Sequence, residues 1–130
     1  MCIYPTAPFV KETDLINALD IMKSNLNAVQ LIPMVKYSYP PQRSYVINDE
    51  GEAIFKYPEY ITARSQDLEK MYHDVGQFYC YNVKKFQEVN GLVYDNIVPY
   101  LVDEMSSQDI DTEKDWKIAE LKYRLLNKQL

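Results

Sequence analysis

The sequence predicts an α/β fold, because runs typical of strands and of helices alternate along a chain of single-domain size. The chain has 130 residues, which is enough to bury a hydrophobic core. Its hydrophobic content of 47% and charged content of 25% are ordinary for a globular protein. Alternation of this kind is typical of the α/β class, in which helices pack against a sheet.

The first third of the chain predicts a strand, a helix and a second strand. Residues 2–4 have the character of the end of a buried strand, which Pro5-Thr6-Ala7-Pro8 breaks. Thr13 is a suitable N-cap for the helix that follows. Residues 28–37 are rich in β-branched and apolar side chains and predict a strand interrupted near Pro33. The helix is predicted by apolar residues at helical spacing, namely Leu15, Ala18, Leu19, Met22 and Leu26.

The middle of the chain predicts a β-hairpin followed by less regular structure. Residues 44–48 and 52–56 flank Asn48-Asp49-Glu50-Gly51. A short loop that contains glycine between two such runs is a hairpin signal. Residues 58–63 predict a loop or a short extended piece, and residues 66–73 predict a short helix.

The last third predicts two strands, a short helix between them and a longer terminal helix. Residues 76–82 predict a strand, and residues 84–89 a short helix that ends near Asn90-Gly91. Residues 96–102 predict a strand that is at an edge or bulged, because proline at position 99 cannot donate a ladder hydrogen bond. Either Asp111 or Thr112 is suited to cap the terminal helix.

The charge of the chain argues against nucleic acid as a partner. The net charge is −5 and the pI is near 4.8. An anionic substrate would therefore need a local group of basic residues. No apolar run approaches the roughly 20 residues that span a bilayer, and the start of the chain lacks the pattern of a signal peptide. We expect no membrane partner.

The two cysteines, Cys2 and Cys80, show neither metal-ligand nor redox spacing. Both lie in apolar, strand-like runs, which predicts buried free thiols. Free thiols fit the reducing cytoplasm.

The segment Gln108 to Trp116 carries the strongest chemical signal. Asp109 and Asp111 close a β-like run directly before the terminal helix. On a strand, residues i and i+2 point to the same side, so both carboxylates would reach one cation. Hard cations such as Mg²⁺ take oxygen ligands, often one or two carboxylates plus substrate phosphates. The alternative is that Asp111 caps the helix and Asp109 is solvated.

A doubly wound α/β domain usually carries a glycine-rich phosphate loop after its first strand. The chain has only three glycines and no such loop, and a strand already begins at residue 2. We therefore expect an amino-terminal half to be missing, so that residues 1–130 form one partial domain.

Three motifs together resemble the acylneuraminate cytidylyltransferase family, the CMP-sialic acid synthetases. They are Tyr4-Pro5-Thr6-Ala7-Pro8-Phe9, the stretch from Arg64-Ser65-Gln66-Asp67-Leu68 to Tyr72-His73-Asp74-Val75-Gly76-Gln77-Phe78-Tyr79, and Asp109-Ile110-Asp111-Thr112 with Asp115-Trp116. The likeness covers nearly the whole chain. Within the family it is closest to the enzymes that act on pseudaminic acid.

The resemblance implies a Rossmann-like nucleotidyltransferase sheet, of the nucleotide-diphospho-sugar transferase type, with helices. It implies a Mg²⁺-dependent enzyme, usually a homodimer, that transfers CMP from CTP to the anomeric hydroxyl of a nine-carbon acidic sugar and releases pyrophosphate. The family's CTP loop is absent from these residues. The chain would then be the sugar- and metal-binding half together with a dimerisation arm.

The resemblance also implies roles for single residues. Asp109 and Asp111 match the metal-binding pair, and Arg64 would hold a sugar carboxylate or a phosphate. Arg43 lies in a segment that reaches toward the partner subunit's site in the family. For both arginines, ordinary surface charge is the alternative. The remaining substrate-binding candidates are Thr6, Gln66, Asp67, His73, Gln77 and Tyr79.

For several of these candidates, a structural role is the alternative to a contact with substrate. Asp67 would equally cap the predicted short helix, and a strand tyrosine such as Tyr79, taken alone, is more often a core residue. His73 is the only histidine, and its place in the family pattern favours a pocket or specificity role over catalysis. For the whole chain, the alternative to a cytidylyltransferase is a truncated, non-catalytic module that dimerises or binds sugar.

The span from Tyr37 to Tyr60 resembles the family's dimerisation arm. The chain contains 12 tyrosines, a residue that fits either a sugar pocket or a subunit interface. A hairpin is marginally stable alone, so this one needs a surface to pack on. That surface is either a second subunit or the rest of its own domain.

Overall fold

The computed structural model describes residues 1–128, which divide into two compact units. The first, here called the sheet unit, comprises Met1–Val35 and the described residues from Asp74 onward. The second, called the hairpin unit, is Lys36–His73. Among residues 1–128, no helix is both long enough and apolar enough to cross a membrane.

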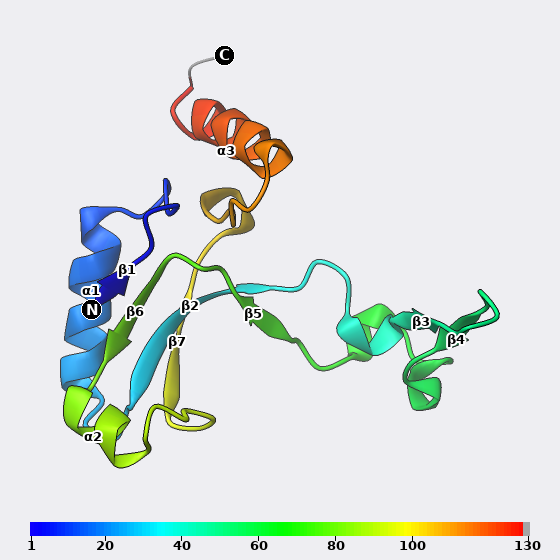
Figure 1. Ribbon diagram of the computed structural model, residues 1–130, viewed down its shortest axis with the longest axis horizontal. Helices are drawn as coiled ribbons and strands as arrows, with labels where there is room; N and C mark the ends of the chain where they lie inside the picture. The colour runs from blue at the N-terminus through cyan, green and yellow to red at the C-terminus, as the bar shows by residue number, and fades with distance from the viewer. Residues whose placement is uncertain (129–130) are drawn as a thin grey trace. The chain divides into compact units, whose positions relative to one another are not determined.

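The sheet is mainly antiparallel and contains one parallel pair (Figure 1). Its strands follow the order β1 (Cys2–Ile3), β6 (Phe78–Tyr81), β2 (Gln30–Lys36) and β5 (Tyr72–Asp74), with β7 (Ile97–Leu101) on β2. β6 runs antiparallel to both β1 and β2, whereas β2 and β7 are parallel. A mixed α/β fold is confirmed. The Rossmann-like sheet stays a prediction.

The core of the sheet unit forms where α1 (Glu12–Ser24) packs alongside β6 (Figure 1). Its centre comprises Ala18 of the helix, Leu31 of β2, and Phe78 and Cys80 of β6. Leu31 and Phe78 are fully buried, and burying a side chain of this size stabilises a fold by about 1.5–3 kcal/mol. The small side chain of Ala18 fits the close approach of helix and strand.

The start of α1 differs from the prediction, because its N-cap is Lys11 and not Thr13. The Asp14 carboxylate accepts a hydrogen bond from the Lys11 backbone N–H over 3.0 Å, which satisfies a donor at the helix start. The other Asp14 oxygen accepts from the Tyr100 hydroxyl over 3.0 Å. This long-range bond ties the first turn of α1 to β7, a constraint that local sequence does not reveal.

The predicted break at Pro33 is wrong, since β2 runs through it without interruption. Proline lacks an N–H, but the Pro33 carbonyl accepts from the Val75 N–H over 3.3 Å. Pairing with β7 continues as far as Met34 and Leu101. The prediction that residues 96–102 form an edge strand is confirmed, because within residues 1–128 β7 pairs with β2 alone.

The cysteine prediction is half wrong. Cys80 is buried in the core, as expected, but Cys2 is exposed. Both residues of β1 are exposed, so the predicted burial of that strand is also wrong. β1 pairs with β6 on one side and has no second neighbour among the described strands.

The two later helices confirm their predictions. α2 (Val83–Glu88) is capped by the Asn82 side chain, which accepts from the Lys85 N–H over 3.3 Å. α3 (Glu113–Leu126) is capped by Thr112, so Thr112 and not Asp111 is the cap. The Thr112 hydroxyl accepts from the Asp115 N–H over 3.3 Å, and Asp115 accepts from the Thr112 N–H over 2.9 Å. This reciprocal pair satisfies two donors at the helix start.

The hairpin unit contains the predicted hairpin, with β3 (Tyr45–Ile47) antiparallel to β4 (Ala53–Phe55). Gly51 adopts a φ of 81°, which allows the tight connection. The helix predicted over residues 66–73 is absent. A short 3₁₀ turn, Ser65–Asp67, is followed by extended chain into β5. The Tyr37 N–H donates to the Met71 carbonyl over 3.0 Å, so residue 71 pairs with another segment instead of closing a helical turn.

Candidate functional site

The sequence-predicted site residues fall into two groups, one in each unit. Thr6, Gln77, Tyr79, Asp109 and Asp111 belong to the sheet unit. The hairpin unit contains the others, which are Arg43, Arg64, Gln66, Asp67 and His73.

Asp109 and Asp111 do not lie on a strand, contrary to the prediction. They occupy an irregular segment between the 3₁₀ turn Glu104–Ser106 and α3. Lys122 of α3 fixes the start of this segment, because its Nζ donates to the Ser107 carbonyl over 2.7 Å. This segment forms no strand, so the argument that both carboxylates point to the same side of a strand no longer holds.

The Asp109 carboxylate lies directly beside Gly76. Its Oδ1 is 3.5 Å from the point where a Cβ on Gly76 would stand, and its Oδ2 is 3.8 Å from that point. Gly76 has a φ of 62°, in the left-handed region that glycine adopts without strain. A turn of the main chain before β6 and the segment before α3 thus meet at the Asp109 side chain.

Asp111 lines an open groove of about 520 Å³ along the first turns of α3. Thr112, Glu113, Trp116 and Lys117 are among its other lining residues. The groove lies within the range of roughly 300–1,000 Å³ that is usual for small-molecule sites. It therefore joins one predicted metal ligand to an exposed aromatic ring and a lysine.

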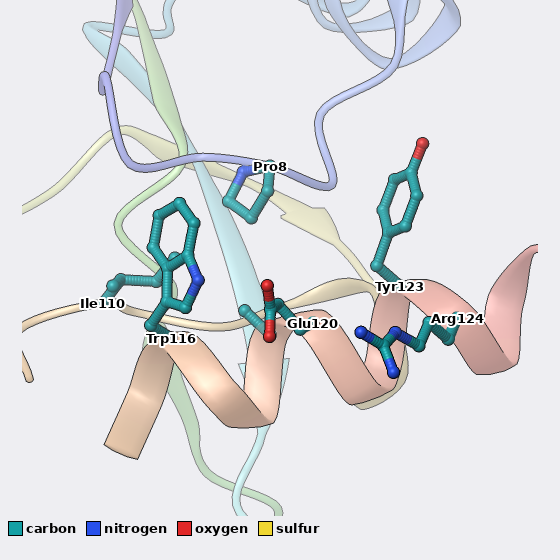
Figure 2. A pocket seen from close by; sticks show the side chains of 7 residues that line it. Pro8, Ile110, Trp116, Glu120, Tyr123 and Arg124 are labelled. Atoms are coloured by element: carbon teal, nitrogen blue, oxygen red, sulfur yellow. The ribbon is translucent and has the colours of Figure 1, made fainter. Parts of the chain in front are cut away.

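A second, smaller cavity of about 230 Å³ lies between Pro8 and the face of α3 that carries Trp116 and Tyr123 (Figure 2). Trp116 and Tyr123 are seven positions apart, so they lie on one side of the helix, with Glu120 between them. The Trp116 ring borders both this cavity and the groove that contains Asp111. The two hollows are neighbours on the same helix.

Asp109 and Asp111 offer the ligand type that Mg²⁺ takes, and binding of the ion stays a prediction. Asp109 and Asp111 are both exposed and offer hard oxygen ligands. Within residues 1–128, no group of three histidine, cysteine or acidic side chains is arranged to hold a metal. Mg²⁺ commonly takes one or two carboxylates and completes its shell with water and phosphate oxygens, so each of these aspartates supplies a ligand of the right type.

Tyr79 is nearly buried, with 9% of its surface exposed. Its hydroxyl donates to Asp74 Oδ2 over 2.7 Å, and its ring meets Tyr4 edge-on at a centroid distance of 5.3 Å. Burial, and then the bond to the Asp74 carboxylate, raise the pKa of Tyr79 well above its usual value. The hydroxyl therefore stays protonated at neutral pH, and its proton is directed at Asp74.

Gln77 connects neighbouring segments of the sheet unit. Its side chain is buried and donates to the Ser106 carbonyl over 2.6 Å. Its own carbonyl accepts from the Tyr4 N–H over 2.9 Å. These bonds hold the end of β1 and the turn before Asp109 to the start of β6. Thr6 is exposed in the turn after β1.

In the hairpin unit, Arg64 forms an ion pair with Asp67, with 2.8 Å between Nε and Oδ2. Both side chains are more than half exposed, so the pair is worth at most about 1 kcal/mol. Asp67 is the last residue of the 3₁₀ turn, so the expectation that it caps a helix is wrong. Arg43 Nη1 donates to the Ala63 carbonyl over 3.1 Å.

Two further candidates occupy this unit. The His73 ring lies on β5 and packs against the Tyr37 ring at a centroid distance of 4.7 Å. Gln66 is exposed in the 3₁₀ turn. Their predicted contacts with substrate, like those of Arg43, Arg64 and Asp67, stay predictions.

Sequence reasoning missed Asp74 and Gly76 as functional candidates. Asp74 receives hydrogen bonds from both Tyr79 and Gly76, and the Asp109 carboxylate borders the space where a Cβ on Gly76 would stand. The signal was present as Asp74-Val75-Gly76, since an aspartate two residues before a glycine commonly bonds to the backbone of its own turn. Trp116 was named only as part of the third motif, whereas it is 57% exposed and borders two hollows.

Comparison with curated proteins gives matches to a class of nucleotidyltransferases, the cytidylyltransferases. No family model matches the chain. The matching proteins are pseudaminic acid cytidylyltransferases, so the resemblance expected from the three motifs is confirmed.

Two of these relatives come from strains of Campylobacter jejuni and are each 28% identical over 124 residues, which is 95% of this chain and 53% of the relative. The third is a Helicobacter pylori protein named for both pseudaminic acid cytidylyltransferase and UDP-2,4-diacetamido-2,4,6-trideoxy-beta-L-altropyranose hydrolase. It is 25% identical over 129 residues, or 99% of this chain and 25% of the relative. The chain thus spans about half the length of the Campylobacter relatives.

Proposed function

We propose that this chain is the sugar- and metal-binding part of a cytidylyltransferase. The complete enzyme would transfer CMP from CTP to pseudaminic acid, or to a related nonulosonic acid, for surface glycan biosynthesis. The observation that carries the proposal is the similarity across 95% of the chain to proteins named for this activity. The Asp109 and Asp111 pair before α3 supplies the chemical support, because its oxygen ligands suit the metal that such a reaction uses.

The proposed reaction is an in-line attack by a sugar hydroxyl on the α-phosphate of CTP, with pyrophosphate as the leaving group. Mg²⁺ held by Asp109 and Asp111 would neutralise charge on the phosphate oxygens. Arg64 would bind an anionic group of the substrate through its planar guanidinium. The other predicted contacts would hold the sugar so that its hydroxyl faces the phosphate. They are Thr6, Gln66, Asp67, His73, Gln77 and Tyr79.

The nucleotide-binding part of the reaction is assigned outside these residues. The 130 residues contain three glycines and no glycine-rich phosphate loop. The relatives are longer, since the chain spans 53% of the Campylobacter proteins. We propose that CTP binds chiefly to additional sequence that carries such a loop. The free thiols of Cys2 and Cys80 further support the proposal that the protein acts in the reducing cytoplasm.

We further propose that the span from Tyr37 to Tyr60, within the hairpin unit, is a dimerisation arm. Tyr45 and Ile47 of β3 and Ile54 of β4 are each at least half exposed. A two-stranded hairpin is marginal in water unless its apolar side chains are covered. A second copy of the chain would cover them and would bring Arg43 toward the partner's site.

Pyrophosphate release tests the proposal directly. The purified chain is assayed with CTP, Mg²⁺ and pseudaminic acid, both alone and in a longer form that includes the coding region upstream. Activity of the longer form that requires all three components supports the proposal. Activity of the 130 residues alone would refute the assignment of CTP binding to other sequence. A longer form that releases no pyrophosphate would instead favour a non-catalytic module.

A further inference from the structure

Asp74 accepts a hydrogen bond at each of its carboxylate oxygens. The Gly76 backbone N–H donates to Oδ1 over 2.8 Å, and the Tyr79 hydroxyl donates to Oδ2 over 2.7 Å. The first bond closes a turn over residues 74–76, and the second fastens that turn to the nearly buried Tyr79 of β6. One side chain therefore fixes both the shape of the turn and its place on the strand.

The turn that Asp74 closes lies beside the Asp109 side chain. Gly76 keeps a φ of 62°, and the space where its Cβ would stand is bordered by the Asp109 carboxylate at 3.5–3.8 Å. The backbone of the turn thus forms one wall beside the Asp109 side chain. A shift of this turn would change which groups, protein or water, surround that carboxylate.

We infer that Asp74 is a positioning residue for the Asp109 carboxylate, acting through the Gly76 turn. The inference rests on the proposed function in one respect, namely that Asp109 is a metal ligand. Groups that orient a metal ligand without touching the metal commonly change metal affinity about 10–100-fold when they are removed. Asp74 has the geometry for this role because both of its oxygens are already engaged by protein donors.

The chain offers a matched control in Asn82. Its side-chain oxygen also accepts a backbone N–H, that of Lys85, and it lies just after the other end of β6. Asn82→Ala therefore removes a bond of the same kind from the same unit without altering the Gly76 turn. Asp74→Asn is the conservative variant, since its remaining carbonyl oxygen still accepts from the Gly76 N–H while the negative charge is lost.

The experiment measures two properties of the full chain. One is the ¹³C chemical shift of the Asp109 carboxyl carbon, and the other is the affinity for Mn²⁺, followed by water-proton relaxation. We expect Asp74→Ala to move the Asp109 shift and to weaken Mn²⁺ binding by at least about 10-fold. Asp74→Asn should keep affinity within about threefold of the parent, and Asn82→Ala should leave both properties unchanged. An amide NMR spectrum of each variant confirms folding.

Three results separate the possible failures. An unchanged Asp109 shift in a folded Asp74→Ala variant overturns the inference. Equal loss of Mn²⁺ affinity in Asp74→Asn and Asp74→Ala also overturns it, because Asp74 would then act through its charge. If the parent binds no Mn²⁺, the proposed metal role of the chain fails, and the Asp109 shift alone decides whether Asp74 positions that side chain.

Discussion

Tyr79 and Asp74 form a hydrogen bond of 2.7 Å between a nearly buried phenol and a carboxylate five residues earlier in the chain. The bond joins the turn that precedes β6 to the strand itself. It gives the Tyr79 hydroxyl a partner within the protein, so the contribution of this residue is first to the architecture of the site. Any contact with substrate would add to that role.

The Tyr79 pKa predicts a loss of stability in alkaline solution. The pKa is raised by burial and by Asp74, whereas an unfolded chain ionises this hydroxyl near pH 10. Above that pH the unfolded state loses a proton that the folded state retains. Unfolding should then become easier by up to about 1.4 kcal/mol per pH unit from this residue alone.

Urea denaturation at pH 9 and pH 11 measures the effect. The difference in stability between the parent and Tyr79→Phe should shrink over this interval, because the variant has no proton to lose at this position. A difference that stays constant between the two pH values would show that the hydroxyl ionises equally in both states.

Gly76→Ala and Gly51→Ala separate backbone strain from contact with Asp109. Both glycines have positive φ, 62° and 81°, so alanine at either position should cost about 1–2 kcal/mol. Only at position 76 does the new methyl meet the Asp109 carboxylate, since nothing lies within 4 Å of a Cβ at position 51. Urea unfolding should give similar losses, and the carboxyl ¹³C shift of Asp109 should move in Gly76→Ala alone. A shift of Asp109 in both variants would contradict a local effect.

Asp111→Ala should reduce turnover of the complete enzyme by about 100-fold or more, because the metal loses one of its two proposed ligands. Glu113→Ala is the matched control, since this carboxylate lines the same groove and is exposed. Pyrophosphate release at saturating CTP and ordinary Mg²⁺ is the measurement. Normal turnover in Asp111→Ala would exclude it from the metal site.

Thr112→Ala should destabilise the chain by about 1 kcal/mol, because its hydroxyl caps α3. Thr13→Ala should be close to neutral, since Thr13 lies inside the first turn of α1 and does not cap it. Chemical denaturation monitored by circular dichroism compares the two variants. Equal losses would mean that the Thr112 cap contributes nothing beyond helix propensity.

Ile47→Asp should shift the chain from dimer to monomer, because it places a charge on the exposed face of the hairpin. Ile47 is 68% exposed, and Leu92, at 74% exposed, is a comparable apolar residue in the sheet unit. Leu92→Asp should leave the assembly state unchanged. Sedimentation at several concentrations measures the outcome, and a parent chain that is monomeric throughout would refute the arm proposal.

Local sequence determined the elements whose signals are local. The hairpin at residues 45–55, the short helix α2 and the start of α3 near Thr112 follow from turn glycines, side-chain caps and spacing within a few residues. The family likeness was likewise predicted from motifs of fixed spacing, and relatives of 25–28% identity confirm it.

Tertiary structure decided what depends on distant partners. β2 continues through Pro33 because Val75 and β7 supply its hydrogen bonds. Residues 66–73 are not helical, since Met71 bonds to Tyr37. Asp109 lies beside Gly76, 33 positions away by numbering, and only the folded chain brings these two together. A single sequence encodes spacing along the chain, whereas contacts of this kind are selected by packing and hydrogen bonding across it.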